Sequence, residues 1–226
     1  MRYSILLLLF LTIISCTNDD DTSKFTTTTA TASDDINNGI YGNGDNNGND
    51  SNNSSNGCAG DYPEWLTSPY VLPYPVGKTY QVALSHCSGS YHSPGQPDQY
   101  AIDFRMNIGT LITAAREGTV VYVQESGTDY MFPNNIVVVK HGDGTYAQYM
   151  HLTKNGALVT PDSFVAKGDS IGYSGATGLA GYPHLHFVVT QDSWPYPYTS
   201  IPYNFKNTAS NPRSLNSGRS YTAEPY

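Results

Sequence analysis

Hydrophobic residues in the second half of the chain fall in short runs separated by glycine and by Asp or Asn turns. The runs are rich in Val, Ile and Tyr, and they lack the 3.6-residue spacing of a long amphipathic helix. Runs of this kind are typical of strands. We expect strands over residues 100–104, 111–115, 118–123, 136–141, 145–152, 165–170, 171–174 and 184–190. The pattern therefore predicts an all-β domain with an antiparallel β-sheet or sandwich.

The strongest hairpin signal joins residues 136–141 to residues 145–152. The connection at 142–144 contains an Asp-Gly step, which accepts a positive φ at low cost. The glycine-rich segment 175–181 is predicted to be a loop, because its glycines favour tight turns. We expect this loop and residues 130–132 to wall a groove.

The start of the chain has a different pattern. Residues 4–14 are almost entirely Leu, Ile and Phe, a run too short to span a bilayer comfortably but typical of a secretory signal peptide. The run leads into Ile13-Ile14-Ser15-Cys16, which resembles a bacterial lipobox. We therefore expect residues 1–15 to be a lipoprotein signal peptide and Cys16 to carry the lipid. The alternative is an ordinary secretory signal with an incidental cysteine.

The segment that follows is polar. Residues 17–57 consist mostly of Thr, Ser, Asn, Asp and Gly, and such a segment buries too little surface to offset its conformational entropy. We predict that residues 16–57 form a lipidated cysteine followed by a disordered tether. Residues 58–226 are long enough for one domain, with a central part at about 90–190 and a C-terminal extension at 193–226.

Export and lipidation would place the domain in the cell envelope. We expect a lipid anchor at Cys16 in the outer membrane of a Gram-negative bacterium, with periplasmic and surface-exposed orientations both open. Cys58 and Cys87 remain as an even pair in an oxidising compartment, and the sequence leaves open whether they form a disulfide. The net charge of −8, without a cluster of Lys or Arg, argues against a nucleic-acid partner.

Two histidines carry the first chemical signal. His184 and His186 would project from the same face of a strand, about 7 Å apart along the backbone. This spacing lets one imidazole bind a metal while the other leans over the open position of that metal. For an isolated pair the alternative is a polar strand face with two solvated histidines.

Asp103 and His151 add to this signal. Ile102 and Phe104 would anchor a strand in the core, which leaves Asp103 on the opposite face. His151 stands at the end of the second hairpin strand. A catalytic zinc ion takes about three protein ligands and keeps one position for water. The alternatives for Asp103 are an ion pair with Arg105 and a role in capping a turn.

Several motifs follow one another in a distinctive order. They are Tyr-Ala-Ile-Asp-Phe at 100–104, Ala-Ala-Arg-Glu-Gly at 114–118, His-Gly-Asp-Gly at 141–144, Tyr-Met-His-Leu at 149–152, Gly-Tyr-Ser-Gly-Ala-Thr-Gly at 172–178 and His-Leu-His-Phe at 184–187. In this order they resemble the M23 family of zinc metallopeptidases, the lysostaphin-like cell-wall endopeptidases. The resemblance implies a lysostaphin-like peptidase fold with a substrate groove, and Zn²⁺ as the cofactor.

The resemblance also implies roles for single residues. An upstream histidine, Asp103 and His186 would bind the metal. His151 and His184 would be the catalytic residues beside the substrate and the metal-bound water. Which of these two is the general base stays open.

The upstream ligand departs from the common His-x-x-x-Asp spacing of the family, because Gln99 occupies that position. A subset of the family places this histidine farther upstream, after a Gly-Ser-aromatic stretch. Gly89-Ser90-Tyr91-His92 fits that variant. We therefore predict His92 as the third metal ligand, with His86 as the second candidate.

Together these features predict a zinc metalloendopeptidase that hydrolyses peptide cross-links of bacterial peptidoglycan with a metal-activated water. Which peptide bond is cut stays open. One alternative is a catalytically inactive M23-like regulator or binding module of cell-wall amidases, although the four retained residues Asp103, His151, His184 and His186 argue against it. The other is an M23 peptidase that acts on Gly-rich secreted proteins.

Overall fold

The structure, a computed structural model, describes residues 58 and 60–226. The predicted signal peptide at 1–15, Cys16 and the predicted tether at 16–57 lie outside the described residues. Within the described part, no helix has the length and apolar character needed to cross a membrane. The helical elements there are two 3-10 turns, η1 (Trp65–Thr67) and η2 (Ser90–His92).

Strands make up the rest of the regular structure in the described part of the chain. They are β1 (Thr79–Leu84), β2 (Ile102–Arg105), β3 (Leu111–Thr113), β4 (Gly118–Gln124), β5 (Ile136–Lys140), β6 (Tyr146–Met150), β7 (Leu152–Ala157), β8 (Phe164–Val165), β9 (Ser170–Ser174), β10 (His184–Gln191), β11 (Thr199–Ser200) and β12 (Ser220–Thr222). Neighbouring strands pair antiparallel. The predicted all-β, antiparallel fold class is therefore confirmed.

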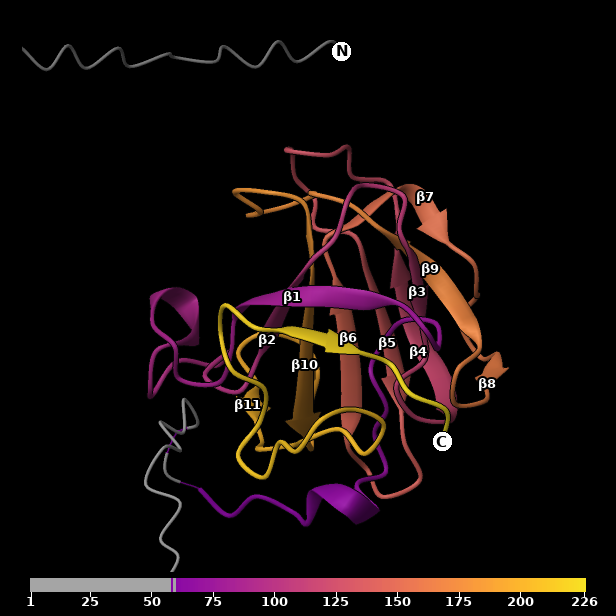
Figure 1. The fold of residues 1–226 in the computed structure, drawn as a ribbon. Helices are drawn as coiled ribbons and strands as arrows, with labels where there is room; N and C mark the ends of the chain where they lie inside the picture. Colours follow the sequence, from indigo (N-terminus) through magenta and orange to yellow (C-terminus); the bar gives the residue numbers. More distant parts are fainter. Residues whose placement is uncertain (1–57, 59) are drawn as a thin grey trace, which may run out of the picture. The chain divides into compact units, whose positions relative to one another are not determined.

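The strands form two sheets (Figure 1). In the nine-stranded sheet, neighbours follow the order β12, β1, β2, β10, β6, β5, β4, β8, and β11 pairs with β10. In the three-stranded sheet the order is β3, β9, β7. Strand β10 thus lies between β2 and β6, near the middle of the large sheet. Any side chain that β10 presents is flanked by side chains from both neighbours.

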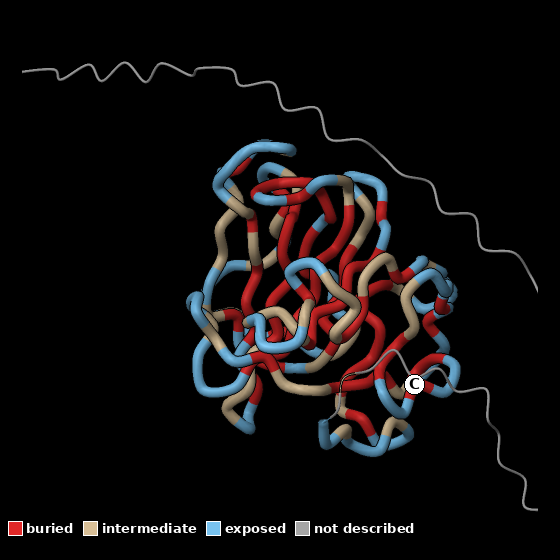
Figure 2. Tube along the Cα trace, turned by 90° about the vertical axis from the view of Figure 1, so that its left-hand side faces the viewer, coloured by how far each residue is buried: buried red, intermediate tan, exposed pale blue. Residues whose placement is uncertain are grey.

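The hydrophobic core gathers along the central strands, while the exposed segments are mostly loops (Figure 2). The core includes Leu185, Phe187 and Val189 from one face of β10. It also draws on residues outside the central part of the domain, namely Tyr70, Leu72, Tyr74, Val82, Tyr203, Phe205, Leu215, Tyr221 and Ala223. Segments before β2 and after β10 therefore complete the packing that supports the large sheet.

Strand register brings the candidate residues together. His186 on β10 lies directly opposite Asp103 on β2. Successive side chains of a strand point to opposite faces, so Leu185 and Phe187 enter the core while His184 and His186 face the other side. On β2, Asp103 follows the same alternation between two buried apolar neighbours.

Two strand predictions differ from the structure. The predicted strand at 165–170 is wrong, because a turn occupies 166–169: Gly168 has φ +89°, and the Asp169 carboxylate accepts a hydrogen bond from the Ala166 N–H at 2.8 Å. The predicted strand at 145–152 is divided into β6 and β7, because His151 between them has φ +64°. Strands β1, β11 and β12 were not predicted.

Candidate metal centre

Asp103 is the centre of the candidate site. Its Oδ1 atom lies 2.8 Å from His186 Nδ1, 3.3 Å from His92 Nε2 and 3.6 Å from His184 Nε2. All four residues are buried. The structure thus brings His92, Asp103 and His186 together, with one potential ligand atom from each within 4.8 Å of the others.

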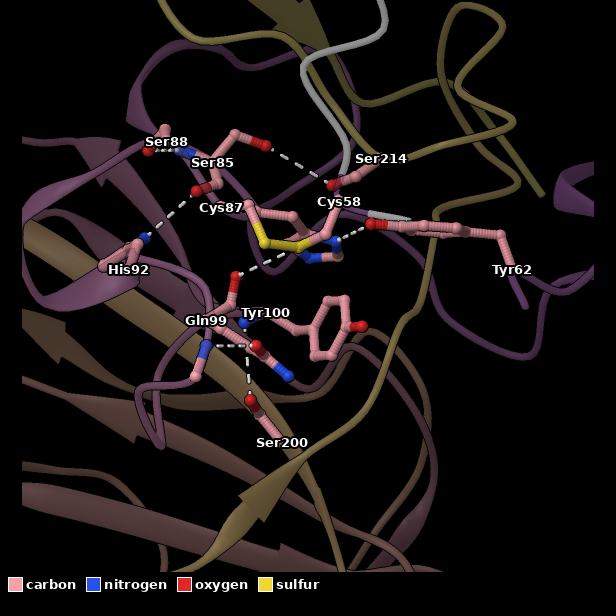
Figure 3. Close-up of a disulfide and its surroundings, with 12 residues drawn as sticks. Cys58, Tyr62, Ser85, Cys87, Ser88, His92, Gln99, Tyr100, Ser200 and Ser214 are labelled. Atoms are coloured by element: carbon pink, nitrogen blue, oxygen red, sulfur yellow. Dashed lines mark hydrogen bonds between the residues drawn. A yellow bond between two sulfur atoms is a disulfide. The ribbon is translucent and has the colours of Figure 1, made fainter. Parts of the chain in front are cut away.

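His92 reaches this cluster because of the turn that carries it. Gly89 has φ +101°, and the turn closes with a hydrogen bond of 3.0 Å from the His92 N–H to the Gly89 carbonyl. The His92 Nδ1–H donates to the Ser85 carbonyl oxygen at 3.3 Å (Figure 3). With Nδ1 held by the backbone, Nε2 is the ring nitrogen that faces Asp103.

A disulfide lies beside this turn. Cys58 and Cys87, whose pairing the sequence leaves open, are bonded in the structure (Figure 3). The Cys87 N–H donates to the Gln99 carbonyl at 2.7 Å. The disulfide therefore ties the entry of the domain to the segment between β1 and β2, the segment that positions His92.

His86 lies elsewhere. Its Nδ1 is 2.9 Å from the Tyr62 hydroxyl, and its ring packs among Tyr62, Tyr100 and Tyr203. Complete burial, together with the nearby His92, holds the pKa of His86 well below its usual value. Neither of the two groups of potential metal ligands in the described residues includes His86. The structure places His86 in an aromatic cluster of the core.

His151 and His184 lie beside the candidate ligands. The His151 Nδ1–H donates to the Thr177 carbonyl at 2.7 Å, and the His184 Nδ1–H donates to the Tyr182 carbonyl at 2.8 Å. The two ring centroids are 4.7 Å apart. Both rings therefore have a fixed tautomer that leaves Nε2 without a proton. Each of them, with His186, offers one ligand atom within 4.8 Å of the others.

Burial sets the charges of these imidazoles. Burial and the neighbouring His186 and His184 lower the pKa of His151 to about 3, and burial lowers the pKa of His184. His186 differs: burial opposes its charged form, but hydrogen bonds to Asp103 and Asp98 raise its pKa to about 10. In the protein chain alone, a proton shared between His186 and Asp103 therefore occupies the centre of the cluster.

This donor set fits a divalent cation. Two imidazole nitrogens and one carboxylate oxygen, all buried, are the kind and number of ligands that a catalytic zinc ion takes. A cation would replace the proton that His186 Nδ1 shares with Asp103.

A groove of about 570 Å³ opens over these residues. Its rim carries exposed apolar side chains, with Tyr91 63%, Phe132 72%, Leu179 61% and Tyr196 72% exposed. The predicted walls at 130–132 and 175–181 contribute Phe132, Leu179 and Gly181. The prediction of a groove walled by these two loops is confirmed.

Three neighbours of the cluster were not predicted. Asp98 Oδ1 lies 3.3 Å from His186 Nε2, the Tyr198 hydroxyl donates to Asp98 Oδ1 at 2.5 Å, and the Tyr182 hydroxyl donates to Asp103 Oδ2 at 3.4 Å. The sequence holds no signal for Asp98 or Tyr198, because both stand in irregular segments. Tyr182 stands next to the His-Leu-His motif and could have been found there.

The alternative ion pair of Asp103 with Arg105 does not describe the arrangement. Arg105 is exposed, and its guanidinium carbon lies 4.6 Å from the centroid of the Tyr182 ring. Asp103 instead faces three imidazoles.

The chain is similar in sequence to several known proteins. Residues 97–197 match the sequence model of peptidase family M23. The glycyl-glycine endopeptidase ALE-1 of Staphylococcus capitis is 34% identical over 159 residues, which are 68% of this chain and 38% of that protein. The peptidoglycan DD-endopeptidase ShyA of Vibrio cholerae is 38% identical over 85 residues, which are 38% of this chain and 18% of that protein.

Among solved structures, lysostaphin from Staphylococcus simulans is 30% identical with a TM-score of 0.43, covering 54% of this chain and 47% of that one. The chain spans less than two fifths of the length of the curated relatives ALE-1 and ShyA.

Proposed function

The chain contains a domain of peptidase family M23, and on this premise we propose that it is a zinc-dependent endopeptidase acting on the peptide cross-links of bacterial peptidoglycan. The observation that carries the proposal is the contact of His92, Asp103 and His186 at the floor of a groove that also holds two neutral imidazoles. These five residues would supply both a metal site and a proton acceptor. An inactive regulator would need neither.

His92, Asp103 and His186 would hold the zinc ion. When bound, zinc lowers the pKa of a coordinated water and polarises the scissile carbonyl. The protein contributes the fixed orientation of the ligands. Backbone contact with Ser85 sets the tautomer of His92, and opposite positions on paired strands set the distance between Asp103 and His186.

His151 and His184 would move the proton. Each is neutral and presents an unprotonated Nε2 toward the cluster, so either atom can accept a proton from the attacking water. The protonated imidazole can then donate to the leaving amine. The carbonyls of Thr177 and Tyr182 keep both rings in the orientation that this exchange requires.

The substrate proposal draws on the relatives. ALE-1 is named as a glycyl-glycine endopeptidase and ShyA as a peptidoglycan DD-endopeptidase, so both are endopeptidases and the name of ShyA gives peptidoglycan as the substrate class. We propose the same class for this chain. Because the rim of the groove is apolar, we expect the groove to recognise the backbone of a peptide more than its charged side chains.

The test uses the purified chain with cross-linked muropeptides of both kinds, those joined through glycine bridges and those joined directly through D-alanine. We expect cleavage that stops after chelation and returns when zinc is restored. Cleavage that persists without metal, or a zinc-loaded protein that cuts neither substrate, would refute the proposal.

Variants separate the two kinds of histidine. We expect His186→Ala to lose bound zinc. His151→Ala and His184→Ala should retain zinc while kcat falls by roughly 10²–10⁴-fold, the usual contribution of a general acid or base. Mass spectrometry of the products gives kcat, and elemental analysis gives the metal content. Unchanged kcat in both of the latter variants would exclude them from proton transfer.

We further propose that a lipid at Cys16 anchors the domain in the cell envelope, which would bring it to this substrate. The proposal rests on the lipobox-like sequence before Cys16. A Cys16→Ser variant should move from the membrane fraction to the soluble fraction. If the same share of the Cys16→Ser variant and of the unmodified chain were found in the membrane fraction, the proposed anchor would be contradicted.

A further inference from the structure

His186 is held by carboxylates on both sides of its ring. Its Nδ1 lies 2.8 Å from Asp103 Oδ1, and its Nε2 lies 3.3 Å from Asp98 Oδ1. Nδ1 faces the carboxylate that His92 also contacts, so Nδ1 is the nitrogen available to a metal. Nε2 then keeps its proton, and Asp98 is the acceptor that faces it.

Asp98 is itself fixed in place. The Tyr198 hydroxyl donates to Asp98 Oδ1 at 2.5 Å, and the Ala101 N–H donates to the Asp98 carbonyl oxygen at 2.9 Å. Asp98 is therefore a carboxylate whose lone pairs point at the donors on His186 and Tyr198.

Two segments far apart in the sequence meet at this point. Asp98 belongs to the loop between η2 and β2, and Tyr198 directly precedes β11. Strand β11 pairs with β10, with Ser200 opposite Thr190. The Ser200 hydroxyl also accepts a hydrogen bond from the Tyr100 N–H at 3.3 Å, which joins the end of the loop to β11. The strand that carries His186 thus also fixes the place of Tyr198.

We propose that Asp98, supported by Tyr198, is a positioning residue that orients His186 for metal binding; the inference rests on the proposed function. A carboxylate that accepts the outer N–H of a metal-binding imidazole fixes the tautomer and the ring orientation and makes the imidazole a stronger ligand. Here this partner comes from the loop and the C-terminal extension, outside the motif that contains His186.

Zinc affinity tests the inference directly. Competition with a chromophoric chelator would measure the dissociation constant of Zn²⁺ for the unmodified chain, Asp98→Ala, Asp98→Asn and Tyr198→Phe. We expect roughly 10–100-fold weaker binding for Asp98→Ala, the range usual for loss of such a partner. Asp98→Asn should lose less, because its amide oxygen still accepts a hydrogen bond, and Tyr198→Phe should lose least.

The control is Asp192→Asn, an exposed carboxylate directly after β10, which should leave zinc affinity unchanged. Absorption of the Co²⁺-loaded proteins gives a second measurement, since a changed ligand at His186 shifts the d–d bands. Thermal melts in chelator show which variants are folded. Should Asp98→Ala fail to fold, Tyr198→Phe, which removes a single hydroxyl, carries the test.

The outcomes separate the inference from the proposed function. Folded Asp98 variants with unchanged zinc affinity and an unchanged Co²⁺ spectrum would overturn the inference and leave the peptidase intact. Weaker zinc binding in a chain that cuts no cross-link would support the inference and refute the peptidase. Weaker cleavage with a raised KM and unchanged zinc affinity would mean that Asp98 contacts the substrate, which also overturns the inference.

Discussion

His92 and His86 are both buried, and they differ in what they face. His92 presents Nε2 to Asp103, while Nδ1 of His86 lies against the Tyr62 hydroxyl. The difference comes from the turn at Gly89, whose positive φ directs the chain back toward β2. The direction of Nε2 in His92 is therefore what distinguishes the candidate ligand from His86.

This distinction predicts opposite outcomes for two alanine variants. His92→Ala should bind zinc more weakly by more than the roughly 10–100-fold that loss of an outer hydrogen-bond partner costs. His86→Ala should keep its zinc but lose about 1–3 kcal/mol of stability, because it empties a packed position and leaves Tyr62 without its partner.

Elemental analysis after dialysis and urea unfolding in chelator measure the two effects. Each variant is the control for the other, because both remove one buried imidazole. Loss of zinc from folded His86→Ala, with zinc retained by His92→Ala, would reverse the assignment.

His151 shows a second feature at this scale. Its φ of +64° is uncommon for a residue with a side chain, and the Asn134 side chain stabilises it by accepting the His151 N–H at 3.0 Å. Such backbone strain is often found at functional sites. The conformation ends β6 and turns the imidazole toward His184.

At the scale of elements, the segment between β1 and β2 contains the turn η2, which carries His92. No strand pairing holds this turn in place. Its fixed points are the Cys58–Cys87 disulfide, the bond from the Cys87 N–H to the Gln99 carbonyl, and the contact of His92 with Ser85. Figure 3 shows the disulfide and the contact of His92 with Ser85. The disulfide should therefore affect both stability and metal binding.

We expect a chain with both Cys58→Ser and Cys87→Ser to lose about 3–4 kcal/mol of stability, from the loop-closure entropy of cysteines 29 residues apart. Its zinc affinity should also fall, because the Ser85 carbonyl that orients His92 becomes less fixed. Urea unfolding and chelator competition measure the two effects. Reduction of the unmodified chain should reproduce both, and zinc affinity that is unchanged by either treatment would show that the turn holds without the bond.

Strand patterns predicted most of the large sheet but not its edges. The runs that became β4, β5 and β10 alternate or are continuously apolar, so their burial is visible in the sequence. Strands β1 and β12 pair with each other and show no such pattern, because their burial depends on contacts between distant segments. The predicted strand at 165–170 was wrong because the Asp169 carboxylate, by accepting a hydrogen bond from the Ala166 N–H, stabilises a turn.

The residues of the candidate site also fall into those that the sequence predicts and those that it does not. Asp103, His184 and His186 could be placed from alternation along two strands, and His151 and His92 needed the family resemblance. Asp98 and Tyr198 could not be predicted, since their positions depend on how an irregular loop meets the C-terminal extension.

At the scale of the whole molecule, buried neutral histidines make stability depend on pH. His141 is not among the residues that line the groove; it directly follows β5, and its Nδ1–H donates to the Glu117 carbonyl at 2.8 Å. Burial lowers its pKa to about 4. The unfolded chain therefore takes up a proton before the folded chain does as the pH falls.

We expect stability to decrease as the pH falls from about 6.5 to about 4, with up to about 3 kcal/mol of the loss due to His141. Replacement by a residue that does not titrate, His141→Asn, should make this part of the pH dependence disappear, although stability at neutral pH falls. Urea unfolding in chelator at pH 7 and pH 4.5 measures the difference. Equal pH dependence in both proteins would contradict the assignment to His141.

The pairing of β1 with β12 has a consequence for how the protein is made. Thr79 lies opposite Thr222, so the large sheet gains its outermost pair only after residue 222 has been synthesised. Contacts of such large sequence separation form slowly. The order of synthesis thus delays completion of the sheet until residue 222 is available. A nascent chain that stops before β12 would therefore contain every candidate ligand, from His92 to His186, but an incomplete sheet.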